Sequence, residues 1–108
     1  MPEIAEQPRV RTRNEVIAAL RRRIDDARRH HATAMFLYGS AARDELTDNS
    51  DVDLFIDYDP DGPMSFVDLF DLRDILADDL QRTVDLTSRN GLHPKLRARI
   101  ERSSLRIF

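Results

Sequence analysis

Segments of strand character alternate with segments of helical period along most of this 108-residue chain, and that order limits the folds open to it. Apolar residues recur every three to four positions in residues 13–30 and 65–80, which indicates amphipathic helices. Residues 34–38 form a short apolar run typical of a buried strand. Val52, Leu54 and Ile56 alternate with Asp51, Asp53, Phe55 and Asp57, as in a half-buried strand with an acidic edge. The order predicts one α/β domain of the two-layer α+β kind, with a small sheet and flanking helices.

The two longest expected helices also carry start signals. Thr12 with Glu15, and Ser65 with Asp68, have the spacing of a capping box, in which side chains and backbone N–H groups pair reciprocally. On the second helix Phe66, Leu69, Leu72, Leu76 and Leu80 are expected to face the core. Further expected elements are a short helix over 41–45, a strand over 83–87, a turn at Asn90-Gly91, a helix from Pro94 to about Arg102 with Leu96 and Ile100 inward, and an extended segment over 105–108.

Composition excludes several classes of protein. The chain has no cysteine, which rules out a disulfide scaffold, a thiolate zinc site and a cysteine nucleophile. No uncharged stretch is long enough to span a bilayer and no secretory signal is evident, so we expect a cytoplasmic protein without a membrane segment. Residues 1–11 contain two prolines and no periodic pattern, and we expect a flexible lead-in there, followed by a single domain over 12–108.

The net charge of −3 conceals a partition along the chain. Residues 32–81 carry a net charge of −11, whereas residues 1–31 carry +3 and residues 82–108 carry +5. A chain that is acidic in total is a poor candidate for nucleic-acid binding, and we expect none. The dense acidic middle suggests a cation site with basic groups nearby, although a solvated acidic surface is the more common interpretation of such a charge run.

Three aspartates are candidates for such a site. Asp51 and Asp53 stand two residues apart at one expected strand, so their side chains leave the same face. Asp85 lies between Val84 and Leu86 in another strand, where a buried acid is costly unless it is paired or bound to a cation. Carboxylate oxygens suit Mg²⁺, which commonly shares its coordination with substrate phosphates.

Each acid also has a plain structural interpretation. Asp51 and Asp53 could form a solvated strand edge, because aspartate supplies 15 of the 108 residues and Asp-x-Asp pairs arise by chance. Asp85 could pair with Arg82 or Arg89. The case for a site therefore depends on the surrounding pattern.

The turn Gly39-Ser40 supplies a candidate phosphate site. It closes an apolar strand and opens a helix, so a phosphate could approach the glycine backbone and meet free N–H groups. The same two residues could instead be a turn and a helix cap. Arg43 could reach a phosphate or lie on the surface.

Together these residues resemble a known family. Gly39-Ser40, ten further residues and then Asp51-Val52-Asp53 fit the G-S-x10-D-x-D pattern of the DNA polymerase β-like nucleotidyltransferases. The minimal nucleotidyltransferase subgroup is similar over residues 13–108, in particular at Leu37 to Arg43, Asn49 to Leu54, Thr83 to Leu86 and Leu92 to Leu96. One departure is Asp44, where members often carry glycine, and we expect it to alter the loop or to weaken the attraction for a triphosphate.

The resemblance implies a nucleotidyltransferase fold, with a mixed sheet and helices on one side. It also implies Mg²⁺, in a two-metal site, and ATP as the substrate. The site residues that it implies are Asp51, Asp53 and Asp85 for catalysis and metal binding, and Gly39, Ser40, Arg43 and Ser50 for nucleotide binding.

The resemblance further implies a toxin–antitoxin setting. Small members of the subgroup pair with HEPN-domain ribonuclease toxins, and some transfer AMP to a tyrosine hydroxyl of that partner. Two alternatives stay open, a non-catalytic antitoxin that covers its toxin and a small-molecule nucleotidyltransferase, although the latter usually has an added domain for its acceptor. A homodimer or a hetero-oligomer with the toxin fits this setting, with Arg89, Lys95, Arg97, Arg99 and any exposed part of helix 65–80 as candidate docking residues.

Overall fold

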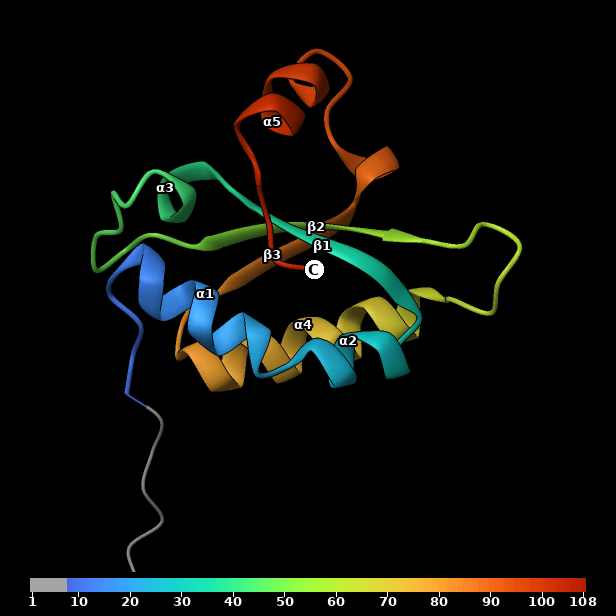
Figure 1. Ribbon diagram of the computed structural model, residues 1–108, viewed down its shortest axis with the longest axis horizontal. Helices are drawn as coiled ribbons and strands as arrows, with labels where there is room; N and C mark the ends of the chain where they lie inside the picture. The colour runs from blue at the N-terminus through green and yellow to red at the C-terminus, as the bar shows by residue number, and fades with distance from the viewer. Residues whose placement is uncertain (1–7) are drawn as a thin grey trace, which may run out of the picture.

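The computed structural model describes residues 8–108, and residues 1–7 of the expected lead-in lie outside that range. In chain order the elements are α1 (Arg13–Arg21), α2 (Ile24–Arg29), β1 (Ala32–Tyr38), α3 (Gly39–Ala42), β2 (Val52–Tyr58), α4 (Phe66–Leu80), β3 (Val84–Ser88), the 3₁₀ turn η1 (Arg89–Gly91), α5 (Arg97–Ser103) and β4 (Leu105–Arg106). Strands follow the order β3-β2-β1-β4 in one sheet. Helices α1, α2 and α4 cover one face, and α5 lies on the other (Figure 1).

The sheet is mixed, which confirms the expected fold class. The expectation of helices on one side only is wrong, because α5 lies on the other face. Strand β2 pairs parallel to β3 and antiparallel to β1, and β1 pairs antiparallel to β4. The parallel pair requires a crossover, and α4 provides it. Because β2 is an inner strand, residues 53–56 have cross-strand partners on both sides, in β1 and in β3.

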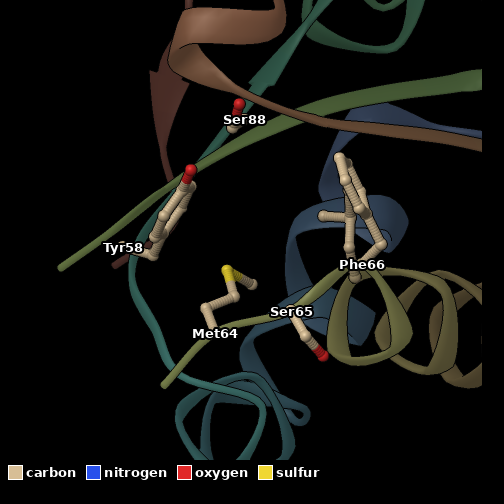
Figure 2. Close-up of a pocket in the computed structure, with 6 residues that line it drawn as sticks. Tyr58, Met64, Ser65, Phe66 and Ser88 are labelled. Atoms are coloured by element: carbon tan, nitrogen blue, oxygen red, sulfur yellow. The ribbon is translucent and has the colours of Figure 1, made fainter. Parts of the chain in front are cut away.

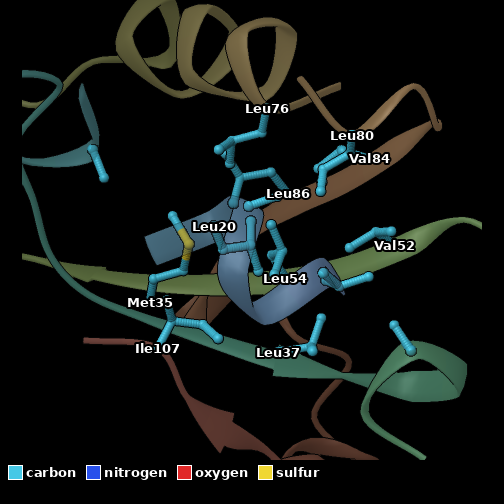
Figure 3. Packing of buried hydrophobic residues seen from close by; sticks show 14 of the residues in the cluster. Leu20, Met35, Leu37, Val52, Leu54, Leu76, Leu80, Val84, Leu86 and Ile107 are labelled. Carbon is cyan, nitrogen blue, oxygen red and sulfur yellow. The ribbon is translucent and has the colours of Figure 1, made fainter. Parts of the chain in front are cut away.

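The hydrophobic core lies between the sheet and the three helices on its covered face. Alternate residues of β2, namely Val52, Leu54 and Ile56, are fully buried there, as period-two alternation requires. Leu76 and Leu80 of α4 pack above Val84, Leu86 and Leu54, with Leu20 of α1 beside them (Figure 3). Val10, which lies within the expected lead-in, is also buried in this cluster.

Both capping boxes predicted from the sequence are present. In α1 the Thr12 hydroxyl accepts a hydrogen bond from the Glu15 backbone N–H, and the Glu15 carboxylate accepts one from the Thr12 N–H. Ser65 and Asp68 form the same arrangement at the start of α4. These local signals lie close in sequence, so they were readable without knowledge of the fold.

The prediction of one helix over residues 13–30 is wrong, because the helix breaks at Arg22–Arg23. The N–H of Arg23 donates to the carbonyl of Leu20, three residues back, at 3.0 Å, which tightens the last turn of α1. The guanidinium of Arg23 then lies 3.3 Å from Asp79, a buried residue near the end of α4. The break therefore coincides with a tertiary ion pair that helical periodicity does not report.

Two shorter helices also differ from their expected bounds. Helix α3 starts at Gly39 and ends before Asp44, whose φ of 58° is incompatible with continuing a right-handed helix. Helix α5 begins at Arg97, after a turn in which the Leu96 N–H donates to the His93 carbonyl at 2.9 Å. Leu96 was expected to face inward and is 46% exposed, because it lies in that turn. The extended segment expected after this helix is β4.

No helix in residues 8–108 is both long and apolar enough to cross a lipid bilayer.

Candidate active site

Asp53 is the centre of a row of three residues across the sheet. It lies opposite Tyr38 of β1 and opposite Asp85 of β3. Neighbouring strands are about 4.8 Å apart, so the side chains of Asp53 and Asp85 are neighbours on one face. Asp51 directly precedes β2 and, two residues before Asp53, leaves the chain toward that same face. The structure thus brings the three predicted carboxylates to one end of the sheet, on the face away from α4.

Asp85 differs from its prediction in one respect, since it is exposed and not buried. Its neighbours Val84 and Leu86 are buried against the core, so alternation turns Asp85 toward the open face. Neither expected arginine pairs with it: Arg82 donates to backbone carbonyls, and Arg89 donates to acids other than Asp85. Within residues 8–108 Asp85 forms no ion pair, which leaves its carboxylate available to a ligand.

The pKa values of two groups at this end of the sheet, Asp53 and Tyr38, are raised. Burial, together with the negative charges of Asp85 and Asp51, raises the pKa of Asp53 to about 6, and Arg43 partly offsets this. Burial and the charges of Asp85 and Asp53 raise the pKa of Tyr38 to about 12. Both shifts have burial as their main cause, and the neighbouring negative charges, which a bound cation would offset, add to it.

Gly39 packs directly against Asp53. Its φ of +69° lies in the left-handed region, which glycine adopts without steric cost. A Cβ at position 39 would lie 2.3 Å from Oδ2 of Asp53, so a side chain here would displace the carboxylate. The half-buried Ser40 follows in the first turn of α3. The predicted Gly-Ser turn is therefore adjacent to the predicted carboxylates.

Two other predicted nucleotide contacts are engaged within the loop that joins α3 to β2. The exposed Arg43 donates to the carboxylate of Glu45 at 3.1 Å. The hydroxyl of Ser50 accepts from the N–H of Thr47 at 2.9 Å and closes a turn immediately before Asp51. Their contact with a nucleotide stays a prediction, and for Arg43 it requires exchange of a weak, exposed ion pair.

A hollow of about 450 Å³ lies beside this turn, between the end of β1 and α5. Its lining combines the basic side chains of Arg43 and Arg99 with the apolar side chains of Leu96 and Ile100. Sequence analysis placed Arg99 only among candidate docking residues. Its position beside Gly39 depends on how α5 folds over the sheet, a contact for which the sequence has no local signal.

Asp44, the departure from the family pattern, has a structural role in this loop. It adopts the left-handed conformation that glycine would take most easily, and aspartate is one of the few other residues that tolerate it. Its carboxylate accepts a hydrogen bond of 2.8 Å from the N–H of Arg13, at the first turn of α1. Asp44 therefore ties the loop to α1.

The donor set fits Mg²⁺, although not as a closed cage. No three histidine or acidic side chains within the described range are close enough together to hold a metal ion by themselves. Mg²⁺ is commonly held by one or two carboxylates, with waters and substrate phosphates completing its octahedron. Asp53, with Asp51 and Asp85 beside it, offers oxygen ligands of that kind on an open face.

The far end of β2 has a different surface. Tyr58 and Phe66 stand on opposite sides of a second hollow of about 450 Å³, with Met64 between them (Figure 2). Phe66 was expected in the core and is 78% exposed, because it lies about 80° around α4 from Leu76 at 3.6 residues per turn. Val67 and Phe70, beside it, are 66% and 49% exposed. This end of the molecule therefore presents an apolar patch, defined here as Phe66, Val67 and Phe70.

The chain is similar in sequence to several curated proteins. The chain is 32% identical over 100 residues to a candidate protein adenylyltransferase, MJ0126, of Methanocaldococcus jannaschii, covering 91% of this chain and 100% of that one. A second candidate protein adenylyltransferase of that organism, MJ1217, is 34% identical over 80 residues, covering 73% of this chain and 80% of its own length.

Solved structures share the fold. A candidate minimal nucleotidyltransferase superposes with a TM-score of 0.69 at 30% identity, covering 86% of this chain and 89% of that one. A toxin–antitoxin structure with AMP-PNP superposes with a TM-score of 0.62 at 21% identity, covering 89% and 72%. The family described as polymerase beta, nucleotidyltransferase, matches residues 24–108, a range that includes the Gly-Ser turn and all three carboxylates. The chain therefore belongs to the polymerase β nucleotidyltransferase family.

Proposed function

We propose that this protein is a Mg²⁺-dependent adenylyltransferase that transfers AMP from ATP to a tyrosine hydroxyl of a HEPN-domain toxin. Membership of the family supports nucleotidyl transfer, and the names of two relatives support a protein acceptor. Toxin–antitoxin structures among the fold neighbours support the setting. The observation that carries the proposal is Gly39 packed against the Asp53 carboxylate, which lies in register with Asp85.

Gly39 and the residues after it would hold the triphosphate. The missing Cβ lets the Asp53 carboxylate pack against the backbone at position 39, so a phosphate bound by the N–H groups that follow would lie beside that carboxylate. The β- and γ-phosphates would lie against Ser40 and its neighbouring N–H groups, with Arg43 and Ser50 at the rim. Asp51 and Asp53 would hold Mg²⁺, which when bound neutralises the charge that develops on the transferred group.

Asp85 would receive the proton of the acceptor. It is exposed, unpaired within residues 8–108, and next to Asp53 in the sheet. As the hydroxyl oxygen bonds to the α-phosphorus, the bond from that phosphorus to the bridging oxygen breaks and pyrophosphate leaves. The hydroxyl proton passes to the Asp85 carboxylate, so charge and atoms balance. The remaining requirement is a hydroxyl aligned opposite the leaving pyrophosphate.

A folded acceptor suits the open geometry. Asp51 and Asp85 are exposed on the sheet face that also carries α5, where a protein partner would bring its own surface and hold the hydroxyl in place. Of the basic docking candidates, Arg89 and Arg97 are engaged with Glu101, whereas Lys95 and Arg99 are exposed. The apolar patch is a further candidate contact and favours the second function, an antitoxin that blocks its toxin by covering it.

Intact-mass spectrometry separates these two functions. The protein is produced with the product of the neighbouring reading frame and incubated with ATP and Mg²⁺. We expect the partner to gain the mass of one or more AMP groups with the unmodified protein and with the Asp59→Asn control at the far end of the sheet. No gain should occur with Asp51→Asn. A tight complex that neutralises the partner without any mass gain would reject catalysis in favour of blocking.

A further inference from the structure

Arg82 is a buried arginine without a carboxylate partner among the described residues. It is 6% exposed and lies in the connection between α4 and β3. Its guanidinium donates only to backbone carbonyls: Nε to Val10 at 2.8 Å, and Nη1 to Thr47 at 2.8 Å and Ser50 at 2.9 Å. Burial and the nearby positive charge of Arg9 lower the pKa of Arg82. A buried charge is costly, and here the carbonyl dipoles compensate it, together with the nearby negative charge of Asp48.

These hydrogen bonds join segments that are distant in sequence and adjacent to the carboxylates. Thr47 and Ser50 belong to the loop that leads into β2, and the Ser50 carbonyl immediately precedes Asp51. On the other side of Asp51, the N–H of Val52 donates to the carbonyl of Thr83 at 3.0 Å. Asp51 is itself exposed, yet its backbone is held on both sides by the two consecutive residues that lead into β3.

We infer that Arg82 is a positioning residue, which fixes the loop over residues 47–50 and so sets Asp51 beside Asp53 before any nucleotide arrives. The inference rests on the proposed function, because it assigns Asp51 a role in holding Mg²⁺–ATP. Asp51 lies just outside β2, so the sheet alone does not fix it. Arg82, just before the neighbouring strand β3, supplies the further constraint that fixes the position of Asp51.

The geometry distinguishes arginine from lysine at this position. The planar guanidinium offers donors in a rigid fork, and two of its nitrogens reach three carbonyls on two separate segments. A lysine ammonium keeps the charge but has a single nitrogen. The Arg82→Lys variant should therefore retain part of the protein's stability and lose part of the order of the loop. The Arg82→Met variant loses both the hydrogen bonds and the charge.

The test compares Arg82→Met and Arg82→Lys with Arg23→Met as a matched control. Arg23 is a half-buried arginine, and its hydrogen bonds within residues 8–108 go to Asp26 and Asp79, away from the loop. Three quantities are measured on the full chain: thermal stability, amide hydrogen exchange at residues 48–52, and the affinity for AMP-PNP with and without Mg²⁺. The last two report positioning independently of catalysis.

In the Arg82→Met variant, the amides of residues 48–52 should exchange about tenfold faster or more. The affinity for Mg²⁺–AMP-PNP should fall about tenfold, which corresponds to the loss of one charge-assisted hydrogen bond. Binding of AMP-PNP without Mg²⁺ should change little. Arg82→Lys should lie between Arg82→Met and the unmodified protein, and Arg23→Met should lower stability without either effect. If Arg82→Met fails to fold, Arg82→Lys carries the same measurements.

Equal rates of amide exchange at residues 48–52 in the Arg82 variants and in Arg23→Met would overturn the inference. So would a loss of affinity for AMP-PNP in the Arg82 variants that is the same with and without Mg²⁺. Failure of the proposed function has a different result, because the unmodified protein would then not bind Mg²⁺–AMP-PNP. In that case the exchange measurement alone still decides whether Arg82 orders the loop.

Discussion

At the scale of single residues, the ionised form of Asp53 is destabilised in the folded protein. Its pKa of about 6 in the folded protein exceeds the value of about 4 for an unfolded chain. Between those pH values the folded state therefore binds more protons than the unfolded state. The contribution of Asp53 to stability is present at low pH and is lost as pH rises through about 6.

Asp53→Asn should therefore abolish AMP transfer while making the protein without ligand more stable at pH 8. The expected gain is about 1–2 kcal/mol after screening, because the variant removes a repelled charge. Chemical denaturation at pH 8 and pH 5 measures it, and the gain should shrink at pH 5, where Asp53 is largely protonated. In the unmodified protein, the NMR signal of the Asp53 carboxyl carbon should titrate near pH 6 and shift to lower pH with Mg²⁺–AMP-PNP. A folded Asp53→Asn protein that transfers AMP at the native rate would refute the assignment.

Gly39→Ala tests the contact between the turn and the carboxylate. The new Cβ would meet Asp53, and the left-handed φ adds about 1–2 kcal/mol of strain. We expect the free energy of nucleotide binding to weaken by more than the free energy of unfolding, since the displaced group is the proposed Mg²⁺ ligand. A double-mutant cycle with Asp53→Ala checks the cause by calorimetry: the binding effect of Gly39→Ala should largely vanish once the Asp53 carboxylate is absent. Additive effects would show that the two residues act separately.

The sequence pattern predicted which candidate residues lie together better than it predicted their surroundings. The spacing from Gly39 to Asp53 is local enough to read directly, and the structure places both residues in contact. The exposure of Asp85 was missed because an apolar strand was taken as buried on both faces, whereas the open face of β3 carries no helix above Asp85. The role of Arg82 was also missed, because its acceptors are backbone carbonyls that leave no mark in the side-chain pattern.

At the scale of secondary-structure elements, α5 is attached to the open face of the sheet mainly through Arg89. Its guanidinium forms two hydrogen bonds with Asp57, at 2.8 and 2.9 Å, and one with Glu101 of α5 at 2.6 Å. The same group lies 4.9 Å from the ring centroid of Phe36 and 5.0 Å from that of Phe55. One arginine thus joins β2, η1 and α5.

Arg89→Met should loosen α5 selectively. We expect a loss of about 1–2 kcal/mol in the free energy of unfolding, because charge-assisted hydrogen bonds and a cation–π contact disappear from a partly exposed site. Amide exchange in residues 97–103 should accelerate, while exchange in β1 and β2 changes only with global stability. Arg102→Met, an exposed substitution on the same helix, is the control. Uniform acceleration across the sheet would contradict a local attachment.

Helix and strand positions were predictable wherever the signal was periodic or capped. The starts of α1 and α4 follow from their capping boxes, and β2 follows from its alternation. The break between α1 and α2 was not predictable from periodicity, because it accompanies an ion pair between Arg23 and a residue more than fifty positions away. Likewise, the order of the strands depends on pairings that no single segment encodes.

At the scale of the whole molecule, the two ends of β2 present different chemistry. One end holds the carboxylates and Gly39, and the other holds the apolar patch of Phe66, Val67 and Phe70. A partner that contacts the patch would therefore approach the molecule away from the reacting groups. This separation allows binding of a partner and chemistry on it to be altered independently.

Phe66→Ser combined with Phe70→Ser tests that separation. Because both side chains are largely or half exposed, stability should change by less than about 1 kcal/mol. Affinity for the co-produced partner should fall at least about tenfold if these two aromatic side chains are anchors of the interface. Isothermal titration with the partner and with Mg²⁺–AMP-PNP measures both properties. An unchanged partner affinity would exclude the patch, and a parallel loss of nucleotide binding would mean that the two ends are not independent.

The pairing of β1 with both a near and a distant strand has a consequence for biosynthesis. Phe36 and Leu37 pair on one side with β2, which follows soon in the chain, and on the other side with Leu105 and Arg106. During translation the β1–β2 hairpin can form early, yet the other edge of β1 stays open until the last strand leaves the ribosome. An open edge is a template for pairing with another chain. Crowded polysomes should therefore favour aggregation of nascent copies, and slower initiation should improve the soluble yield.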